Sequence, residues 1–119
     1  MDETQFSNAR EAHREDMSVE FERSLEAYNK KNDFKINYIR ISGTDPQHWA
    51  ITGQNGSRVG IIAMKVREFT NEFTLELACD NKGGGLIFDS NEKEQAFKGT
   101  VENFIKDAVV YGRAYYAPK

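Results

Sequence analysis

The sequence predicts an α+β fold, in which an N-terminal and a C-terminal helix flank a five-stranded antiparallel meander sheet. Near each end of the chain, apolar residues recur at the spacing of one face of a helix. Between these stretches, short runs rich in β-branched and aromatic residues have the composition of strands. The turns between the runs are short, and short connections join antiparallel neighbours.

The composition describes an ordinary globular chain. We expect residues 1–119 to form a single domain, with a polar segment at 1–15 and a C-terminal tail at 113–119. The formal net charge of −3 is too small to predict a partner. A single cysteine, Cys79, leaves no internal disulfide and fits a reducing compartment. Without a signal-peptide pattern or an apolar run of roughly 20 residues, we expect a soluble cytoplasmic protein that does not enter a membrane.

The first predicted element is an amphipathic helix. Its apolar face consists of residues at intervals of four, four and three: Met17, Phe21, Leu25 and Tyr28. Ser7 is a candidate N-cap, and the helix is predicted to end near residues 29–32, where two lysines suit the negative end of the dipole. So narrow an apolar stripe needs a sheet to pack against.

Residues 34–41 and 48–53 are predicted to form the first two strands, separated by a turn at 42–46. The alternation in the first strand slips, because Ile39 and Ile41 fall on the face opposite Ile36 and Tyr38. Either both faces are covered near its end, or a bulge at Tyr38–Ile39 resets the register.

The Asn55–Gly56 dipeptide predicts a hairpin with a two-residue type I′ turn, since both residues tolerate positive φ. The third strand, residues 59–66, is apolar on both faces. We therefore expect it in the centre of the sheet, with both faces covered.

Residues 73–79 alternate between apolar and polar and predict a strand with one buried face. A glycine-rich loop at 80–85 and a short edge strand at 86–88 follow. Asp89 or Ser90 is a candidate cap of the last helix, and Gly112 is predicted to end it. The apolar stripe of that helix is Phe97, Val101, Phe104, Ile105, Ala108 and Val109, with Gly99 on the outer face.

No pattern typical of catalysis, metal binding or cofactor binding is found, so we expect a protein that is not an enzyme and holds no cofactor or metal. His13 is expected in solvent, and His48 is either a general base or a partner of Asp45. Cys79 falls on the apolar face of its strand and is expected in the core. Residues 82–85 lack the ending of a phosphate-binding loop and lead into a strand, which favours a hairpin tip.

An excess of apolar surface suggests a contact with another protein. If both helices cover one sheet face, the other face must meet a second copy or a partner; one helix on each face would need neither. The tyrosine-rich C-terminal end is predicted to join such a contact, because tyrosine is enriched in interfaces. Its candidate partner-binding residues are Tyr111, Arg113, Tyr115 and Tyr116. We therefore expect a small non-enzymatic protein-binding module, a homodimer or an accessory, regulatory or inhibitory protein that occludes a partner surface.

The alternative is a single-stranded nucleic-acid-binding protein. Residues 34–67 carry an excess of basic residues, and Tyr38 and Trp49 could stack bases on the sheet. The candidate nucleic-acid-binding residues are Arg40, Arg58, Lys65 and Arg67. The competing interpretation pairs these basic residues with acidic residues of neighbouring elements and places both aromatic rings in the core.

Overall fold

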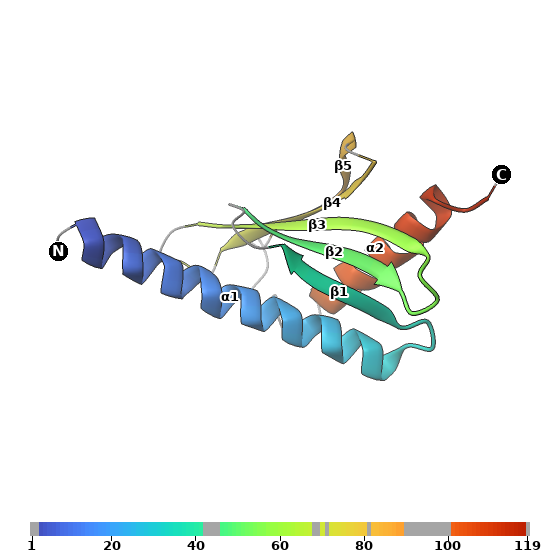
Figure 1. Ribbon diagram of the computed structural model, residues 1–119, viewed down its shortest axis with the longest axis horizontal. Coiled ribbons are helices and arrows are strands. Elements are labelled where there is room, and N and C mark those ends of the chain that lie inside the picture. Colours follow the sequence, from blue (N-terminus) through green and yellow to red (C-terminus); the bar gives the residue numbers. More distant parts are fainter. Residues whose placement is uncertain are drawn as a thin grey trace.

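The computed structural model describes residues 3–41, 46–67, 70, 72–80, 82–89 and 101–118, and it confirms the predicted fold class (Figure 1). The elements are α1 (Glu3–Lys31), β1 (Ile36–Ile41), β2 (Gln47–Gly53), β3 (Arg58–Val66), β4 (Phe73–Cys79), β5 (Lys82–Asp89) and α2 (Val101–Tyr115). The five strands pair in chain order, each antiparallel to its neighbours, so the sheet is a meander with β3 at its centre.

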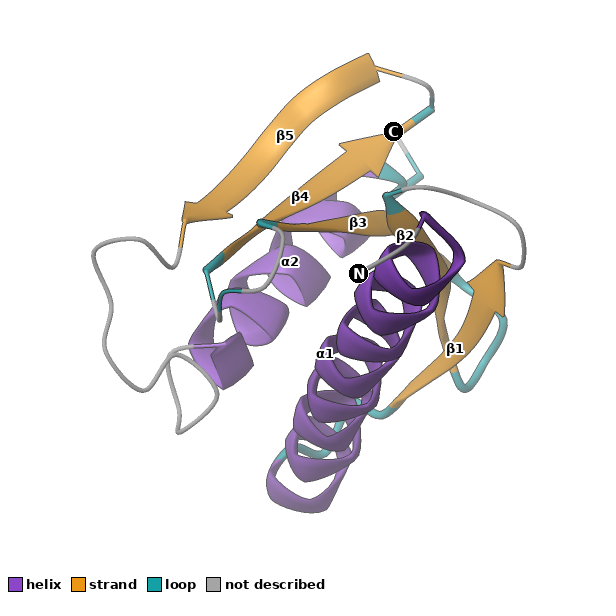
Figure 2. Cartoon of the chain, turned by 90° about the vertical axis from the view of Figure 1, so that its left-hand side faces the viewer, coloured by secondary structure: helices purple, strands orange, loops and turns teal. Residues whose placement is uncertain are grey.

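Both helices lie against the same face of the sheet, as Figure 2 shows from the end of α1. Phe21 of α1 packs on Trp49 of β2, with ring centroids 4.6 Å apart. Phe104 of α2 lies 6.1 Å from Phe88 of β5, again between ring centroids. The strand register places Trp49 and Phe88 on one face. The chain therefore does not adopt the alternative with one helix on each face.

The hydrophobic core fills the space between this face and the two helices. All four apolar residues predicted for the first helix are buried: Met17, Phe21, Leu25 and Tyr28. The sheet contributes Ile36, Trp49, Ile51, Val59, Ile62, Met64, Phe73, Leu75, Leu77 and Cys79. The period-two pattern of β4 and the core placement of Trp49 and Cys79 are thereby confirmed.

α1 begins earlier than predicted, and α2 ends later than predicted. α1 begins at Glu3, so Ser7 lies inside it rather than capping it, and most of the polar segment 1–15 is helical. Its first residues include neither glycine nor proline, so nothing in them stops the helix earlier. α2 continues past Gly112 to Tyr115, which shortens the predicted tail. Gly112 is buried, and a Cβ atom there would overlap the backbone carbonyl of Val59, so this glycine allows close approach rather than ending the helix.

The hairpin between β2 and β3 forms where it was predicted, but its turn is not type I′. The Gly53 carbonyl accepts a hydrogen bond from the Gly56 N–H at 2.9 Å, and the Gly53 N–H donates to the Ser57 carbonyl at 2.8 Å. Gly56 has a φ of 84°, whereas Asn55 has no positive φ. The loop is thus a type I turn followed by a left-handed glycine. The Asn55 side chain fixes it by accepting a hydrogen bond from the Ser57 hydroxyl at 2.6 Å.

β1 and β5 also differ from prediction in detail. β1 pairs with β2 without a register shift, so the proposed bulge at Tyr38–Ile39 is absent and Ile39 points away from the helices. β5 begins at Lys82, which places residues 83–85 in the strand rather than in a loop. Asp89 is the last residue of β5. Ser90, Phe97 and Gly99, together with the turn at 42–45, lie outside the described residues.

The central position of β3 is confirmed, but the prediction that both of its faces are covered is wrong. Ile62 is 1% exposed, whereas its neighbour Ile61 is 39% exposed. The pairing with β2 shifts between Ile51 and Thr52, which turns Val59 to the same covered side as Ile62. The extra aliphatic residues of β3 therefore line a face that neither α1 nor α2 covers.

Replacement of Gly112 by alanine tests the close approach of α2 to the sheet. Helix propensity alone would stabilise the protein by about 1 kcal/mol. The overlap with the Val59 carbonyl predicts the opposite sign, a loss of about 1–3 kcal/mol in the free energy of unfolding. Urea unfolding measures this change in the free energy of unfolding. The control is Ala114→Gly at an exposed position of the same helix, which reports the difference in helix propensity without the overlap. An unchanged or raised stability of Gly112→Ala would contradict this packing.

Candidate functional site

The sheet face opposite the helices is the candidate functional site, and we call it the open face. The strand register arranges its side chains in two rows that cross the sheet. The first row is Ile39, Ala50, Ile61 and Ala78. The second row is Ile41, His48, Ala63, Glu76 and Ile87. Thr52, Lys65 and Thr74 extend the face beyond these rows.

The open face exposes aliphatic side chains from three strands. Ile39 on β1 is 70% exposed, Ile61 on β3 39% and Ile87 on β5 65%. Ala50 alone separates Ile39 from Ile61 within the first row, so these two isoleucines form one apolar surface with Ala50 and Ala78, whereas Ile87 lies beside Glu76 in the second row. A contiguous apolar patch of this kind typically marks an interaction site.

His48 lies on this surface and is half-buried. Its Nδ1 atom is buried and finds no hydrogen-bond partner among the described residues. Asp45, the partner considered from the sequence, lies outside those residues. Glu76 stands in the same row, with Ala63 between them. The second row thus combines an imidazole and a carboxylate in an otherwise aliphatic setting.

The open face contains a depression of about 410 Å³. Its lining includes Ala50 of β2, Ile61 of β3 and Ala78 of β4. The charged side chains at its rim are already engaged. Arg58 forms a 3.4 Å ion pair with Asp80 and lies 4.5 Å from the centroid of the Tyr116 ring. The Tyr116 hydroxyl accepts a hydrogen bond from the Asp80 N–H at 2.9 Å. Burial is the main cause that raises the pKa of Tyr116.

The partner-binding residues predicted at the C-terminal end do not share one surface. Tyr116 borders the open face through its contacts with Arg58. Tyr111 and Tyr115 are exposed on α2. The Arg113 guanidinium stacks on Phe34, 3.8 Å from the ring centroid. The Tyr115 ring also packs edge-on against Tyr116, with centroids 5.0 Å apart, so three of these four side chains make contacts within the chain and one of them, Tyr116, reaches the open face.

The candidate nucleic-acid-binding residues are also divided. Arg40 lies on the covered face, where its Nη1 pairs with Glu15 at 2.6 Å and its Nη2 with Glu22 at 2.8 Å. Arg67 pairs with Glu72 at 2.9 Å. Arg58 and Lys65 flank the open face from the two ends of β3. No continuous basic stripe connects these four residues.

The contacts of Arg40 with the two glutamates of α1 fix that helix on the sheet, and no spacing in the sequence predicts them. Besides the contact with Arg40, Glu22 accepts a hydrogen bond from the Trp49 indole N–H at 2.9 Å. Burial raises the pKa of Glu22, but the hydrogen bonds from Arg40 and Trp49 and the charge of Arg40 outweigh it, so the pKa lies below its ordinary value. Burial and the hydrogen bond to Glu26 raise the pKa of Tyr38 to about 12.

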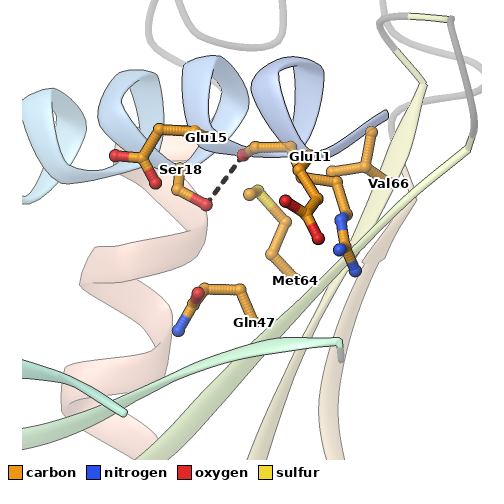
Figure 3. Close-up of a pocket in the computed structure, with 7 residues that line it drawn as sticks. Glu11, Glu15, Ser18, Gln47, Met64 and Val66 are labelled. Carbon is orange, nitrogen blue, oxygen red and sulfur yellow. Dashed lines mark hydrogen bonds between the residues drawn. The ribbon is translucent and has the colours of Figure 1, made fainter. Parts of the chain in front are cut away.

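A smaller hollow of about 150 Å³ lies on the covered side, between α1 and the β2–β3 strands (Figure 3). Two of its polar groups are satisfied locally: the Ser18 hydroxyl donates to the Arg14 carbonyl at 2.9 Å, and the Gln47 amide donates to the Ile41 carbonyl at 2.9 Å. The volume is below the roughly 300 Å³ at which ligand pockets begin. We do not treat it as a binding site.

His13 is half-buried rather than solvated, and its Nε2 donates a hydrogen bond to the Thr70 carbonyl at 2.5 Å.

Within the described part of the chain, His, Cys, Asp and Glu side chains form no group of three or more that could hold a metal ion. No helix among those residues combines the length and hydrophobicity of a membrane span. Comparisons with protein-family models, characterised proteins and solved structures give no significant match to this chain.

Removal of the Glu22 charge tests how α1 is held. Because the pKa of Glu22 is lowered in the folded state, the carboxylate stabilises the fold above the ordinary glutamate pKa and loses this effect as pH falls through the folded-state value. We expect Glu22→Gln to lower the free energy of unfolding by about 1–2 kcal/mol near neutral pH and by progressively less as pH falls below about 4.

Urea unfolding of both proteins over this pH range measures the difference. Glu20→Gln, which removes an ion pair with the exposed Arg23, controls for the loss of a surface charge. A difference between parent and Glu22→Gln that stays constant with pH would show that the charge of Glu22 does not hold the helix.

Proposed function

We propose that this chain is a protein-binding module that acts by stoichiometric association through its open face. One observation carries the proposal: both helices occupy one side of the sheet, so Ile39, Ile61 and Ile87 remain in solvent on the other. Each Å² of apolar surface removed from water contributes roughly 25 cal/mol to association. A partner that covers these isoleucines would use surface that the isolated chain leaves hydrated.

The chemistry of the open face specifies the kind of partner. Its centre is aliphatic, because Ala50 and Ala78 lie on either side of Ile61 in the first row and Ala63 lies in the middle of the second. Aliphatic sheet faces pack against other sheets at a separation of about 10 Å. The partner we propose is therefore a protein that presents an aliphatic sheet face. Bound to a partner other than itself, the chain would hide that face from competitors, which is an accessory or inhibitory role.

The same surface supports a nucleic-acid partner less well. Binding of single strands relies on exposed aromatic rings that stack on bases. Here the large exposed side chains of the open face are isoleucines, whereas Trp49 is buried and Tyr38 bonds to Glu26 on the helix side.

The free thiol of Cys79 supports a reducing compartment, and we propose that the interaction takes place in the cytoplasm.

Site-specific photo-crosslinking in the native host tests the proposal. A photoreactive residue replaces Ile61 or Ile87 on the open face, and in the control it replaces Asn103, which is exposed on α2. We expect protein adducts of defined mass from both open-face positions and none from the control. Adding Ile39→Asp to the open-face probes should reduce these adducts by tenfold or more, a change on the order of 1.4 kcal/mol.

Each adduct is identified by mass spectrometry, and its binding is reproduced with purified proteins. Equal labelling from Asn103 and the open-face positions would contradict the proposal. Adducts with nucleic acid rather than protein would replace it with the nucleic-acid hypothesis.

A further inference from the structure

We infer that the protein that covers the open face is a second copy of this chain, packed face to face about a two-fold axis that runs along β3. The inference rests on the proposed function and names its partner. It follows from the order of side chains in the two rows, because such an axis places β2 of one copy opposite β4 of the other and β1 opposite β5. Each residue of the second row, and Ala50, Ile61 and Ala78 of the first, is thereby assigned a specific neighbour.

The second row is symmetric about β3 in size. It reads Ile41, His48, Ala63, Glu76, Ile87 from β1 to β5. Under the two-fold axis, Ile41 lies opposite Ile87 of the second copy, and Ala63 lies on the axis opposite itself. The residues at the two ends of the row are aliphatic, and the side chain in its middle is small. The two copies can therefore meet along this row without a large side chain facing a gap.

The same row is complementary in hydrogen bonding, because an imidazole N–H donates and a carboxylate accepts. The axis brings His48 opposite Glu76 of the second copy, and this contact occurs twice in the dimer. The Nδ1 of His48 is buried within its own chain, so the exposed part of the half-buried imidazole makes this contact. Side chains as long as histidine and glutamate span the roughly 10 Å between packed sheets. A symmetric interface needs such self-complementarity, since one patch must serve as both partners.

The first row gives the centre of the contact. Ala50 on β2 lies opposite Ala78 of β4 in the second copy, and both side chains are small. Ile61 lies on the axis and meets Ile61 of the second copy between them. Its neighbours in the row are alanines on both sides, which leaves room for the two isoleucines to interlock. Lys65 and Arg58 lie at the two ends of β3, at the rim of the contact, where Arg58 keeps its ion pair with Asp80.

The size of the face sets the expected strength. The second row spans five strands about 4.8 Å apart, and Thr52 and Lys65 lie one row beyond the two rows at opposite ends, so the face measures about 24 by 20 Å. This gives about 1,000 Å² over both copies, near the lower limit for a specific interface. We therefore expect a reversible dimer with a dissociation constant in the micromolar range, rather than an obligate one.

Sedimentation velocity over a range of protein concentrations tests the inference. The parent should change from monomer to dimer as concentration rises, and Ile61→Asp, which places two carboxylates on the axis, should weaken the dimer at least 100-fold. His48→Glu and Glu76→His should each weaken it about tenfold, because the first places two carboxylates together and the second removes the carboxylate that accepts from the imidazole. The double variant His48→Glu with Glu76→His restores the imidazole–carboxylate contact and should recover the parent affinity. Circular dichroism confirms that each variant folds.

Tyr111→Asp, on the exposed side of α2, is the matched control and should leave the dimer unchanged. Loss of the dimer in Tyr111→Asp but not in Ile61→Asp would overturn the inference in favour of a helix-mediated contact. A parent that stays monomeric at all concentrations, or a double variant no better than the single ones, would also overturn it. The proposed function is tested separately from the dimer. Photo-crosslinks from Ile61 to a different protein would support the binding module and would contradict self-pairing.

Discussion

Alternate residues of β2, β3 and β4 direct their large apolar side chains to one side of the sheet, and both helices lie on that side. Trp49 on β2 and Ile62 on β3 are neighbours there, and Phe21 of α1 packs on the Trp49 ring. α2 can lie as close as it does because Gly112 has no side chain against the Val59 backbone. An ion pair of 2.8 Å between Lys31 and Glu102 joins the two helices. With both helices used on one side, the chain has no described element left to cover the other.

The open face follows from this one-sided packing and carries the functional proposal. A solvent-facing sheet surface usually carries polar side chains at alternate positions. Here β1, β3 and β5 instead place isoleucines in water, with alanines between them. The polar groups that interrupt the apolar surface, His48 and Glu76, stand in one row on either side of β3. The placement of both helices on one side thus explains the exposed surface, and the order of its residues is the basis on which we propose a second copy as its partner.

The sequence predicted the class of fold, the order of the strands and most of the core, because these depend on local patterns. The spacing of Phe21 and Leu25 and the alternation in β4 are set by the geometry of a helix and a strand, independent of what packs on them. The slip at Ile39 and the two apolar faces of β3 were also visible in the sequence. The cause of these two features was not visible there, because the bulge near Val59 and the uncovered face both depend on where the helices lie.

Other features could not be read from the sequence, because they join distant residues. Nothing in the spacing connects Glu22 with Arg40 and Trp49, although together they fix α1 on the sheet. Gly112 resembles a helix stop in sequence, and only the nearness of Val59 shows that it is a contact residue. The basic residues of the sheet suggested one surface, but strand alternation sends Arg40 to the helix side and Lys65 to the open face.

Nuclear magnetic resonance of the isoleucine methyl groups tests one-sided packing most directly. Ile61 and Ile62 are adjacent on β3 but point to opposite faces. In a sample dilute enough to be monomeric, a soluble paramagnetic agent should broaden the Ile61 methyl signal strongly and leave the Ile62 signal sharp. At high concentration the Ile61 signal should become protected as the second copy covers it. Equal protection of both methyl groups in the monomer would contradict the account, because part of the chain itself would then cover the open face.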